Sequence, residues 1–495
     1  MNPQLMLDGH DIGSIYLDPK SRDDIPQILR GLQHIYTTPT LRAQVFIILR
    51  EVIPNSGGGQ GKADATTGRP GMEQWRILVL GVLRLGLNAD YDRIQELANQ
   101  HSTLRQMLGH GDWTDQTQYK LQTLKDNLRL FTPELLDRIN RAVVEAGHVL
   151  VKKSPTEGLA ARCDSFVVQT HVHYPTDINL LWDAMRKTIE IVAQLCQEYG
   201  LTDWRQSAYN LRQLKKLYRQ AQKLKHSTSQ DEIKRENKKE TMLEAHRDYL
   251  EQARAHLDQA HRSREQLLAA VLAQGRLGQS LLSELDGYME HAARQIDQIR
   301  RRVLEGQSIP HDEKVFSLFQ PHTEWISKGK AGVPVELGLR VCVVEDQHRF
   351  ILHHQVMEKT TDDAIAVSIT ERTKKSYDTL RSVSMDKGFH SKANQDQLKE
   401  IVELVVMPRK GRLSVVDKAT ESEPEFIRLR RQHSAVESAI NALESHGLDL
   451  CRDHGIVGFK RYVALAVVAR NIQRMGAILR QQEVDRIRGP YRKAA

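Results

Sequence analysis

The apolar residues at the start of the chain recur every three or four positions, which is the spacing of amphipathic helices. This pattern covers residues 22–53 and 72–150 and predicts an all-α N-terminal region over 1–150. A run that begins at Pro54 (Pro-Asn-Ser-Gly-Gly-Gly-Gln-Gly) separates the two stretches, so we expect a flexible linker near 54–71. Small helical domains commonly read DNA, and we expect this region to bind DNA, with a helical packing domain as an equally open alternative.

A long helical segment follows further along the chain. No proline occurs over 176–309, although the chain has 15. Within that stretch apolar residues follow a three-four spacing, as at Leu211, Leu214 and Tyr218. This predicts a helical coiled-coil arm over 184–310, inserted between strand-like sequences on both sides. Its exposed Lys and Arg residues are typical of a solvated coiled-coil surface, which accounts for them better than a dedicated DNA track.

The sequence on both sides of the arm has the pattern of an α/β fold. Strand-like apolar runs occupy 161–170, 333–344, 349–356, 382–385 and 401–407. Helical patterns occupy 362–380, 391–399, 434–445 and 459–480. With the arm set aside, this is the strand and helix order of an RNase H-like domain. We therefore predict an α/β RNase H-like catalytic domain with a mixed five-stranded sheet over 151–183 plus 311–480, followed by a basic tail over 481–495.

Length, charge and cysteine content narrow the class of protein. A chain of 495 residues is expected to form more than one core. Its net charge of +8 and its pI of 9.1 favour a polyanionic partner such as nucleic acid. The four cysteines form no C-x-x-C pair, and the sequence carries neither a signal peptide nor an apolar run of membrane-spanning length. We expect a reduced, cytoplasmic and nucleoid-associated protein that does not enter a membrane.

Three acidic residues occupy places in this order of elements where carboxylates can converge. Asp164 lies on the first predicted strand, Asp386 directly beyond the fourth, and Glu437 on the helix after the fifth. Mg²⁺ prefers carboxylate oxygen, and two ions about 3.5–4 Å apart can activate an attacking oxygen and stabilise a leaving oxygen at phosphorus. We predict that these three catalytic residues hold two Mg²⁺ ions, with Mn²⁺ as a substitute. Glu444, one heptad beyond Glu437, is a rival for the third ligand.

Longer motifs around these acids resemble those of a known family. The blocks are Asp164-Ser-Phe-Val-Val-Gln-Thr-His-Val-His-Tyr-Pro-Thr-Asp, Met385-Asp-Lys-Gly-Phe-His-Ser and His433-Ser-Ala-Val-Glu-Ser-Ala-Ile-Asn-Ala-Leu-Glu. They resemble the motif blocks of bacterial insertion-sequence DDE transposases, most closely the ISNCY-type group, and the likeness covers most of residues 70–480. In this resemblance, the metal-binding acids of the family map onto Asp164, Asp386 and Glu437.

The resemblance implies a DNA transposase of an insertion sequence. Such an enzyme binds double-stranded DNA at the terminal inverted repeats of its element, where metal-activated water frees a 3′-hydroxyl. That hydroxyl then attacks a phosphodiester of the target DNA, without a covalent protein–DNA intermediate. A homodimer in the synaptic complex is expected by analogy. Two other classes stay open: an RNase H-like metal-dependent nuclease or resolvase, which cuts without joining, and a non-catalytic DNA-binding descendant.

Basic residues near the predicted metal site are candidates for DNA contact. The family carries Tyr-x2-Arg-x3-Glu-x6-Lys around its last acid, and this chain departs from it with Arg430, His433 and Glu444 at the flanking positions. Arg430, Arg431 and His433 are the candidates to replace those contacts. Two basic loops are further candidates for phosphate contact, with a solvated loop as the alternative. They contain Arg409, Lys410 and Arg412 in one case and Lys328 and Lys330 in the other.

Two pairs of potential metal ligands invite a zinc interpretation. They are His171 with His173, and Cys451 with His454. Neither has a second pair at the spacing of a zinc site. We therefore predict no zinc site.

Overall fold

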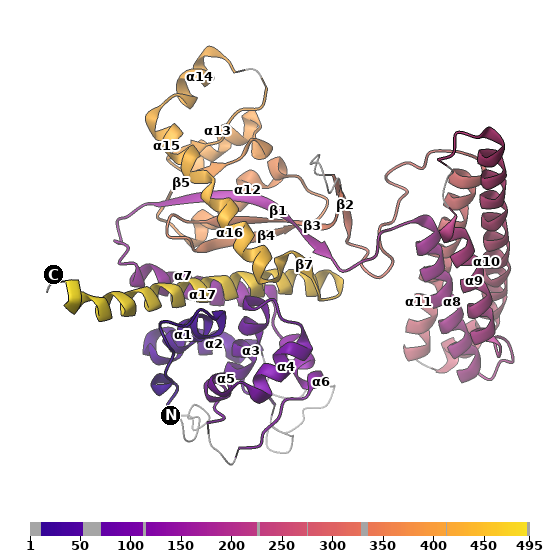
Figure 1. Ribbon diagram of the computed structural model, residues 1–495, viewed down its shortest axis with the longest axis horizontal. Coiled ribbons are helices and arrows are strands. Elements are labelled where there is room, and N and C mark those ends of the chain that lie inside the picture. The colour runs from indigo at the N-terminus through magenta and orange to yellow at the C-terminus, as the bar shows by residue number, and fades with distance from the viewer. Residues whose placement is uncertain are drawn as a thin grey trace. The chain divides into compact units, whose positions relative to one another are not determined.

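The computed structural model describes residues 11–52, 71–111, 115–224, 228–274, 276–327, 335–411 and 413–492. The predicted linker near 54–71 lies almost wholly outside the described residues. The chain forms two compact units (Figure 1). Residues Val172–Thr323 form one, which we call the inserted unit. The residues up to His171 and from Glu324 form the other, which we call the sheet unit.

In the described part of the chain, the sheet unit contains a mixed, open sheet of seven strands. Their bounds are β1 Leu159–Thr170, β2 Glu324–Ser327, β3 Val335–Glu345, β4 Ile351–Met357, β5 Leu380–Met385, β6 Leu404–Val406 and β7 Leu450–Cys451. β1 lies in the middle, because it pairs antiparallel with β3 and parallel with β5, which in turn pairs parallel with β6. The prediction of a mixed α/β fold is confirmed, but the prediction of five strands is wrong.

Two short strands account for this difference. β2 pairs antiparallel with the first part of β3, whose second part pairs with β4. β7 pairs parallel with the last two residues of β1, beyond the part of β1 that pairs with β5. Strands of four and two residues are too short to leave a period-two apolar pattern. The sequence therefore did not indicate them.

Helices cover both faces of the sheet. Those of the sheet unit are α1 Asp24–Thr37, α2 Pro39–Val52, α3 Gln74–Gly86, α4 Tyr91–Gln100, α5 Ser102–Met107, α6 Leu121–Leu128, α7 Pro133–Leu150, α12 Asp362–Ser376, α13 Lys392–Ile401, α14 Val415–Glu421, α15 Pro424–His433, α16 Ala435–Leu443 and α17 Gly455–Arg492. α12 and α13 share one apolar core with Ala161 and Cys163 of β1. α16 and α17 share the opposite core with Phe166 and Val168. Because side chains alternate along a strand, Asp164 belongs to the α16 face.

The N-terminal helices do not form a core of their own. α1 to α7 share an apolar core with α17 and with the α16 face of the sheet. α7 and α17 lie between the sheet and the other N-terminal helices (Figure 1). Phe459 and Val467 of α17 are fully buried there, so region 1–150 and the sheet belong to one compact unit. α17 extends to Arg492, so the described residues of the predicted tail 481–495 continue this helix.

α1 and α17 cross with their backbones in direct contact. A Cβ atom added to Gly31 would lie 2.2 Å from the Ile472 carbonyl oxygen, and one added to Gly476 would lie 1.9 Å from the Gln27 carbonyl oxygen. Both distances are far below van der Waals contact, so a larger residue fits at either position only if a helix moves. This contact joins the two ends of the described chain.

The inserted unit is a bundle of helices. In the described residues they are α8 Asp177–Glu198, α9 Ser207–Lys223, α10 Glu232–Gln274 and α11 Arg276–Ile299, and they share their own apolar core. The unit runs from Val172 to Thr323, whereas the arm was predicted over 184–310. α8 begins early because Thr176 Oγ1 accepts a hydrogen bond from the Asn179 N–H at 3.2 Å and caps the helix. Although α10 has 43 residues, no helix in the described part of the chain is both long and apolar enough to cross a membrane.

We expect Gly476→Ala to lower the free energy of unfolding of the sheet unit by about 1–3 kcal/mol, because the added methyl group forces α1 away from α17. Urea unfolding followed by circular dichroism measures the loss. Gly287→Ala is the matched control, since an added Cβ at Gly287 in α11 meets no heavy atom within 4 Å. This substitution should stabilise its helix by about 0.5–1 kcal/mol. Equal effects of the two changes would contradict the contact between α1 and α17.

Candidate functional site

The pairing of β1 with β5 brings two of the predicted acids together. Cys163 pairs with Met385 in parallel register, and this is the last pair between the two strands. The next residue is an aspartate in both cases, Asp164 and Asp386. Residues in register on neighbouring parallel strands point to the same face of a sheet. The register therefore directs both aspartates to the edge of the α16 face.

Asp164 is half-buried and surrounded by acidic groups. Its Oδ1 accepts a hydrogen bond from the Ser165 backbone N–H at 2.7 Å. Burial is the main cause that raises the pKa of Asp164 to about 7. The negative charges of Asp386, Asp362 and Glu437 raise the pKa further, whereas the hydrogen bond from Ser165 lowers it. The three predicted acids therefore lie within electrostatic reach, and a fourth, Asp362, joins them.

Asp386 and Glu437 are both exposed and lie where helices begin. Asp386 precedes the short 3₁₀ helix Lys387–Phe389, and its Oδ1 accepts a hydrogen bond from the Gly388 backbone N–H at 2.6 Å. Glu437 lies in the first turn of α16, where the helix dipole stabilises a carboxylate. It follows Val436, which is fully buried in the core between α16 and the sheet. The packing of α16 therefore positions Glu437 beside the end of β5.

Asp362 is a site residue that the sequence did not indicate. It is the first residue of α12, and it accepts a hydrogen bond from Ser165 Oγ at 2.6 Å. A Cβ atom added to Gly388 would lie 2.8 Å from Asp386 Oδ1 and 3.3 Å from Asp362 Oδ2, so this glycine fits between the two carboxylates. Acids are common in the first turn of a helix because of the helix dipole. In the sequence, Asp362 and its neighbour Asp363 are equivalent as helix-start residues.

The donor atoms of the four carboxylates fit a hard divalent cation, because Mg²⁺ and Mn²⁺ prefer carboxylate oxygen. A cation there would also offset the repulsion that contributes to the raised pKa of Asp164. Among the described residues, however, no three His, Cys, Asp or Glu side chains lie close enough together to hold one metal ion. Asp386 and Glu437 are exposed, and exposed side chains change rotamer readily. The residue types therefore fit a divalent cation, whereas their described arrangement does not bring three of them close enough to bind one.

Two of the predicted DNA-contacting residues lie next to the acids. Lys410 Nζ donates a hydrogen bond to the Gly388 carbonyl oxygen at 2.9 Å, in the turn that Asp386 caps. His433 Nδ1 lies 3.1 Å from Ser384 Oγ. Burial lowers the pKa of His433, and the nearby carboxylates of the site oppose this effect. Lys410 therefore contacts the turn that follows Asp386, and His433 contacts β5 two residues before Asp386.

The other predicted DNA-contacting residues are paired with acids, exposed or not described. Arg409 forms an ion pair with Asp417. Arg430 forms one with Glu421 at 3.5 Å, so the charge of both arginines is partly offset within the chain. Arg431 is exposed on α15. Three candidates lie outside the described residues: Lys328, Lys330 and Arg412.

Glu444 and His173 are also candidate metal ligands, and their surroundings differ from those of the acids at the candidate site. Glu437 is one of three acids whose charge acts on Asp164, after Asp386 and Asp362, whereas Glu444 lies about 10 Å further along the helix axis. In the inserted unit, His173 Nε2 lies 2.7 Å from Asp183 Oδ2. This contact explains the position of His173 without a metal.

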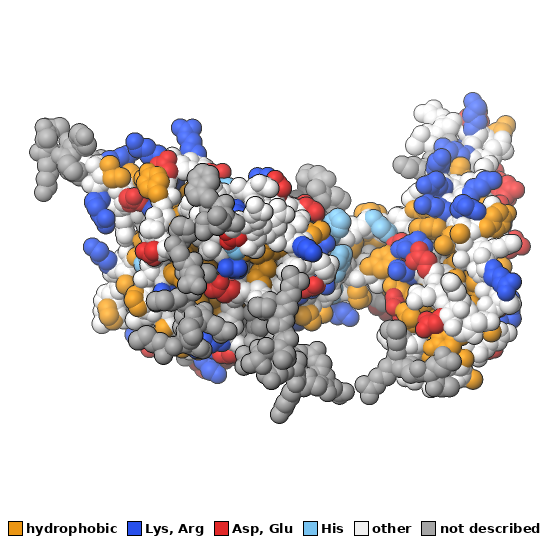
Figure 2. Space-filling model, turned by 90° about the horizontal axis from the view of Figure 1, so that it is seen from below, with side chains coloured by type: hydrophobic (Ala, Val, Ile, Leu, Met, Phe, Trp, Pro, Cys, Tyr) orange, Lys and Arg blue, Asp and Glu red, His pale blue; other side chains and the backbone are white. Residues whose placement is uncertain are grey.

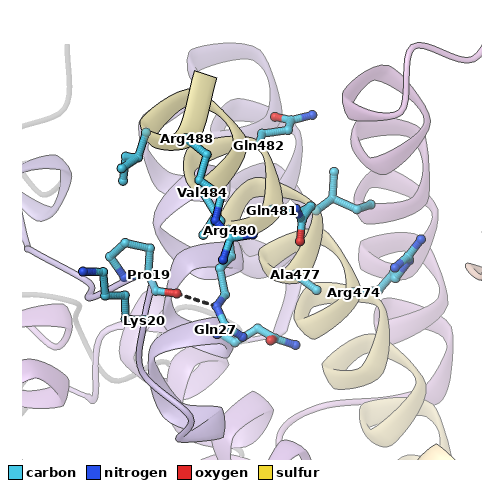
Figure 3. A pocket seen from close by; sticks show the side chains of 12 residues that line it. Pro19, Lys20, Gln27, Arg474, Ala477, Arg480, Gln481, Gln482, Val484 and Arg488 are labelled. Atoms are coloured by element: carbon cyan, nitrogen blue, oxygen red, sulfur yellow. Dashed lines mark hydrogen bonds between the residues drawn. The ribbon is translucent and has the colours of Figure 1, made fainter. Parts of the chain in front are cut away.

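A large cavity in the sheet unit lies beside α17 and not at the acids. It has a volume of about 1040 Å³, and Figure 3 shows Pro19 and Gln27 on one side and α17 residues from Arg474 to Arg488 on the other. Arg480 Nε donates a hydrogen bond to the Pro19 carbonyl oxygen at 2.7 Å. The described residues that line this cavity include no carboxylate. Its size therefore does not mark it as a metal centre.

The support for the candidate site comes from the chain itself. No family model, curated protein or solved structure matches the sequence or the fold. The assignment consequently depends on the register of β1 with β5, on the position of α16 and on the chemistry of the four carboxylates.

We expect Asp164→Asn to stabilise the metal-free protein at neutral pH. Folding raises the pKa of Asp164 from its ordinary value of 3.8 to about 7, so the stability that this group contributes is complete below pH 3.8 and is lost as the pH rises to about 7. The amide removes this loss and should raise the free energy of unfolding at pH 7 by about 1–3 kcal/mol. Denaturant unfolding with a chelator present measures the difference. The difference in free energy of unfolding between variant and wild type should grow from acidic to neutral pH. A difference that stays constant would contradict the raised pKa. So would an equal difference in the control variant Asp363→Asn.

Proposed function

We propose that this chain is the DNA transposase of an insertion sequence, with an RNase H-like catalytic domain and a two-metal DDE active site. The observation that carries the proposal is that Asp164 on β1, Asp386 directly after β5 and Glu437 on α16 lie at one edge of the sheet, where the charges of the last two act on Asp164. The transposases that the chain resembles hold their metal-binding acids at these positions. Carboxylates brought together in this way are costly without a cation, which supports a site that binds one.

The strand order supports the RNase H-like domain. With the short β2 and β7 set aside, the order is β4-β3-β1-β5-β6. β4, β3 and β1 are antiparallel neighbours, and β5 and β6 run parallel to β1. An RNase H-like sheet has this order and these directions, with its first acid on the middle strand. Asp164 on β1 is in that place.

In the proposed mechanism Asp164, Asp386 and Glu437 hold two divalent cations. When bound, these cations supply an activated oxygen nucleophile and stabilise the oxygen that leaves phosphorus. Water first attacks the phosphodiester at the end of the element, the bond from phosphorus to the 3′-oxygen breaks, and the strand is left with a 3′-hydroxyl. That hydroxyl then attacks a phosphodiester of the target DNA, so one P–O bond forms as another breaks.

Other residues of the chain position the carboxylates and the substrate. Ser165 donates its backbone N–H to Asp164 and its hydroxyl to Asp362, so a single residue restrains two carboxylates. Lys410 lies at the turn that carries Asp386, where its charge would offset that of a phosphate. Contacts of this kind help to hold the carboxylates and the substrate in the alignment that in-line displacement at phosphorus requires.

We expect Asp164→Ala, Asp386→Ala and Glu437→Ala each to reduce Mg²⁺-dependent cleavage of the element's end by at least about 100-fold, because loss of a ligand removes several kcal/mol of transition-state stabilisation. A gel assay on a duplex taken from the DNA beside the gene measures the rate. Glu444→Ala is the matched control, since it removes an acid of the same helical segment and should leave the rate unchanged. Binding of the duplex, followed by gel shift, should persist in all four variants.

A variant of one of the three acids that cleaves at the wild-type rate would remove that residue from the active site. A second substrate with a precleaved end tests the joining step. Transfer of this end into target DNA is expected of a transposase. Cleavage without transfer would instead identify a nuclease or resolvase, and binding without Mg²⁺-dependent cleavage a non-catalytic DNA-binding protein.

A further inference from the structure

A small polar cavity lies on the α16 face of the sheet, beside the carboxylates. It has a volume of about 200 Å³ and is bounded by β1, β5 and α15. Its described polar lining has two guanidinium groups, two hydroxyls and two amides, with no carboxylate. These groups belong to Arg162, Arg349, Ser382, Ser384, Gln347 and Gln432. A lining so rich in donors matches an anion with several acceptor oxygens.

The register of β1 with β5 sets the distance from this cavity to the acids. Arg162 pairs with Ser384. Each lies two residues before an aspartate of the site, Asp164 or Asp386. The Arg162–Ser384 pair and the two aspartates therefore lie on the same face of the sheet, about 7 Å apart. Neighbouring phosphates along one strand of nucleic acid have a comparable separation.

The charged groups next to the cavity are arginines and two acids, Glu345 at the end of β3 and Asp346 directly after it. The Arg162 side chain is 11% exposed, and its Nη2 lies 3.0 Å from Glu345 Oε2. Its Nε is buried and has no hydrogen-bond partner among the described residues. Arg470 and Arg349 also act on the same Glu345 carboxylate. Glu345 and Asp346 thus face three guanidinium groups. Arg162 also donates to the carbonyl oxygens of Gln432 and Asp346, whereas Arg349 is exposed and can turn to an external anion.

A tight turn holds Arg349 at the cavity. Arg349 has a φ of +68°, in the left-handed region that side chains rarely adopt. Asp346 Oδ1 accepts hydrogen bonds from the backbone N–H groups of His348 and Phe350, both at 2.9 Å, and Oδ2 lies 2.6 Å from His148 Nε2. Asp346 is therefore engaged within its own turn. Strained residues of this kind cluster at functional sites, and Arg349 is exposed and lines this cavity.

We propose that this cavity binds the backbone phosphate that neighbours the one cleaved at the carboxylate site. The identity of the ligand rests on the proposed function, while the cavity and its charge do not. Arg162 and Arg349 donate to the phosphate oxygens, and the Ser384 hydroxyl completes the set. Contacts of this kind fix the register of a nucleic-acid strand without reading its bases.

The first test uses the full chain without divalent cations and inorganic phosphate as the probe. A ligand that binds the native state raises its melting temperature. Phosphate should raise that of the wild type above its value in chloride at equal ionic strength. Arg349→Gln should weaken phosphate binding by about tenfold, since a hydrogen bond to a charged group contributes about 1.5–3 kcal/mol. Arg452→Gln is the matched control, because Arg452 is an exposed arginine outside the cavity and should bind phosphate like the wild type.

A second arm replaces phosphate with a short oligothymidylate and should show the same loss in Arg349→Gln. Equal stabilisation of the wild type and Arg349→Gln by phosphate, or none of the wild type, would overturn the cavity as a phosphate site. Loss with phosphate but not with the oligonucleotide would overturn its assignment to a nucleic-acid backbone. A third outcome is that Arg349→Gln loses stabilisation by both probes while the wild type cleaves no DNA. This result would support the cavity as a phosphate site and overturn the proposed function.

In the inserted unit, a basic stripe runs along α9. This helix has five basic residues and no acidic one, and all five basic side chains are exposed. They are Arg212, Lys215, Lys216, Arg219 and Lys223. Their spacing of three, one, three and four residues places them on one side of the helix over about 16 Å. α9 therefore presents one positive face.

The neighbouring helix α10 carries charges of both signs. It has eight basic and eight acidic residues, and Lys234, Lys239 and Arg247 form ion pairs with acids. None of the five basic residues of α9 forms an ion pair with another described residue. Figure 2 shows Lys and Arg side chains gathered on the displayed face of the inserted unit. A stripe with no internal counter-charge suits an extended polyanion.

We further propose that α9 binds the phosphate backbone of double-stranded nucleic acid. In the triple variant R212Q/K216Q/R219Q of the full chain, the slope of log affinity against log salt concentration should become shallower by about 2–3, because three phosphate contacts are lost. Fluorescence anisotropy with a duplex of arbitrary sequence measures the slope.

The control K234Q/K238Q/K239Q removes the same net charge from α10. It should leave the slope close to that of the wild type. Equal slopes for the two triple variants would overturn the assignment to α9. So would a wild type that binds vesicles of anionic lipid but no duplex, since the partner would then be a membrane surface.

Discussion

The parallel register of β1 with β5 is the constraint on which the candidate site depends. A slip of one residue would turn Asp164 to the opposite face and separate it from Asp386. The register is set on the α12 face, where Ala161, Cys163 and Met385 are buried in an apolar core. Apolar packing on one face of the sheet thus determines which charged groups meet on the other. The same register places the polar cavity beside the carboxylates.

Repulsion between carboxylates that are brought together opposes folding, and packing elsewhere in the sheet unit offsets this cost. Its core extends from the N-terminal helices through α17 to the sheet. Two contacts join these parts closely: the glycine crossing of α1 with α17, and the ion pair of Arg84 with Asp453 at 2.8 Å, whose side chains are 3% and 7% exposed. Unfavourable local arrangements persist only where the surrounding structure holds them. A bound cation would remove the opposition and couple metal binding to stability.

Strands and helices that depend on local apolar spacing were predicted well from the sequence. Strands and helices that carry Asp164, Asp386 and Glu437 were visible in apolar spacing, and their order indicated a mixed sheet. Asp362 was not predictable, because an acid at a helix start has an ordinary explanation in the helix dipole. Nor was the shared core of the N-terminal helices and α17, since the contact of Gly31 with Ile472 joins distant segments of the chain that leave no mutual trace in one sequence.

In the proposed site, Asp164, Asp386 and Glu437 together hold divalent cations. Iron-mediated cleavage of the polypeptide tests this most directly, because Fe²⁺ can replace Mg²⁺ at carboxylates and, with ascorbate and peroxide, cuts the backbone near where it binds. Fragments that end near residues 164, 386 and 437 are expected, and excess Mg²⁺ should suppress them. Fragments that end elsewhere, or cleavage that Mg²⁺ does not suppress, would contradict the proposed site.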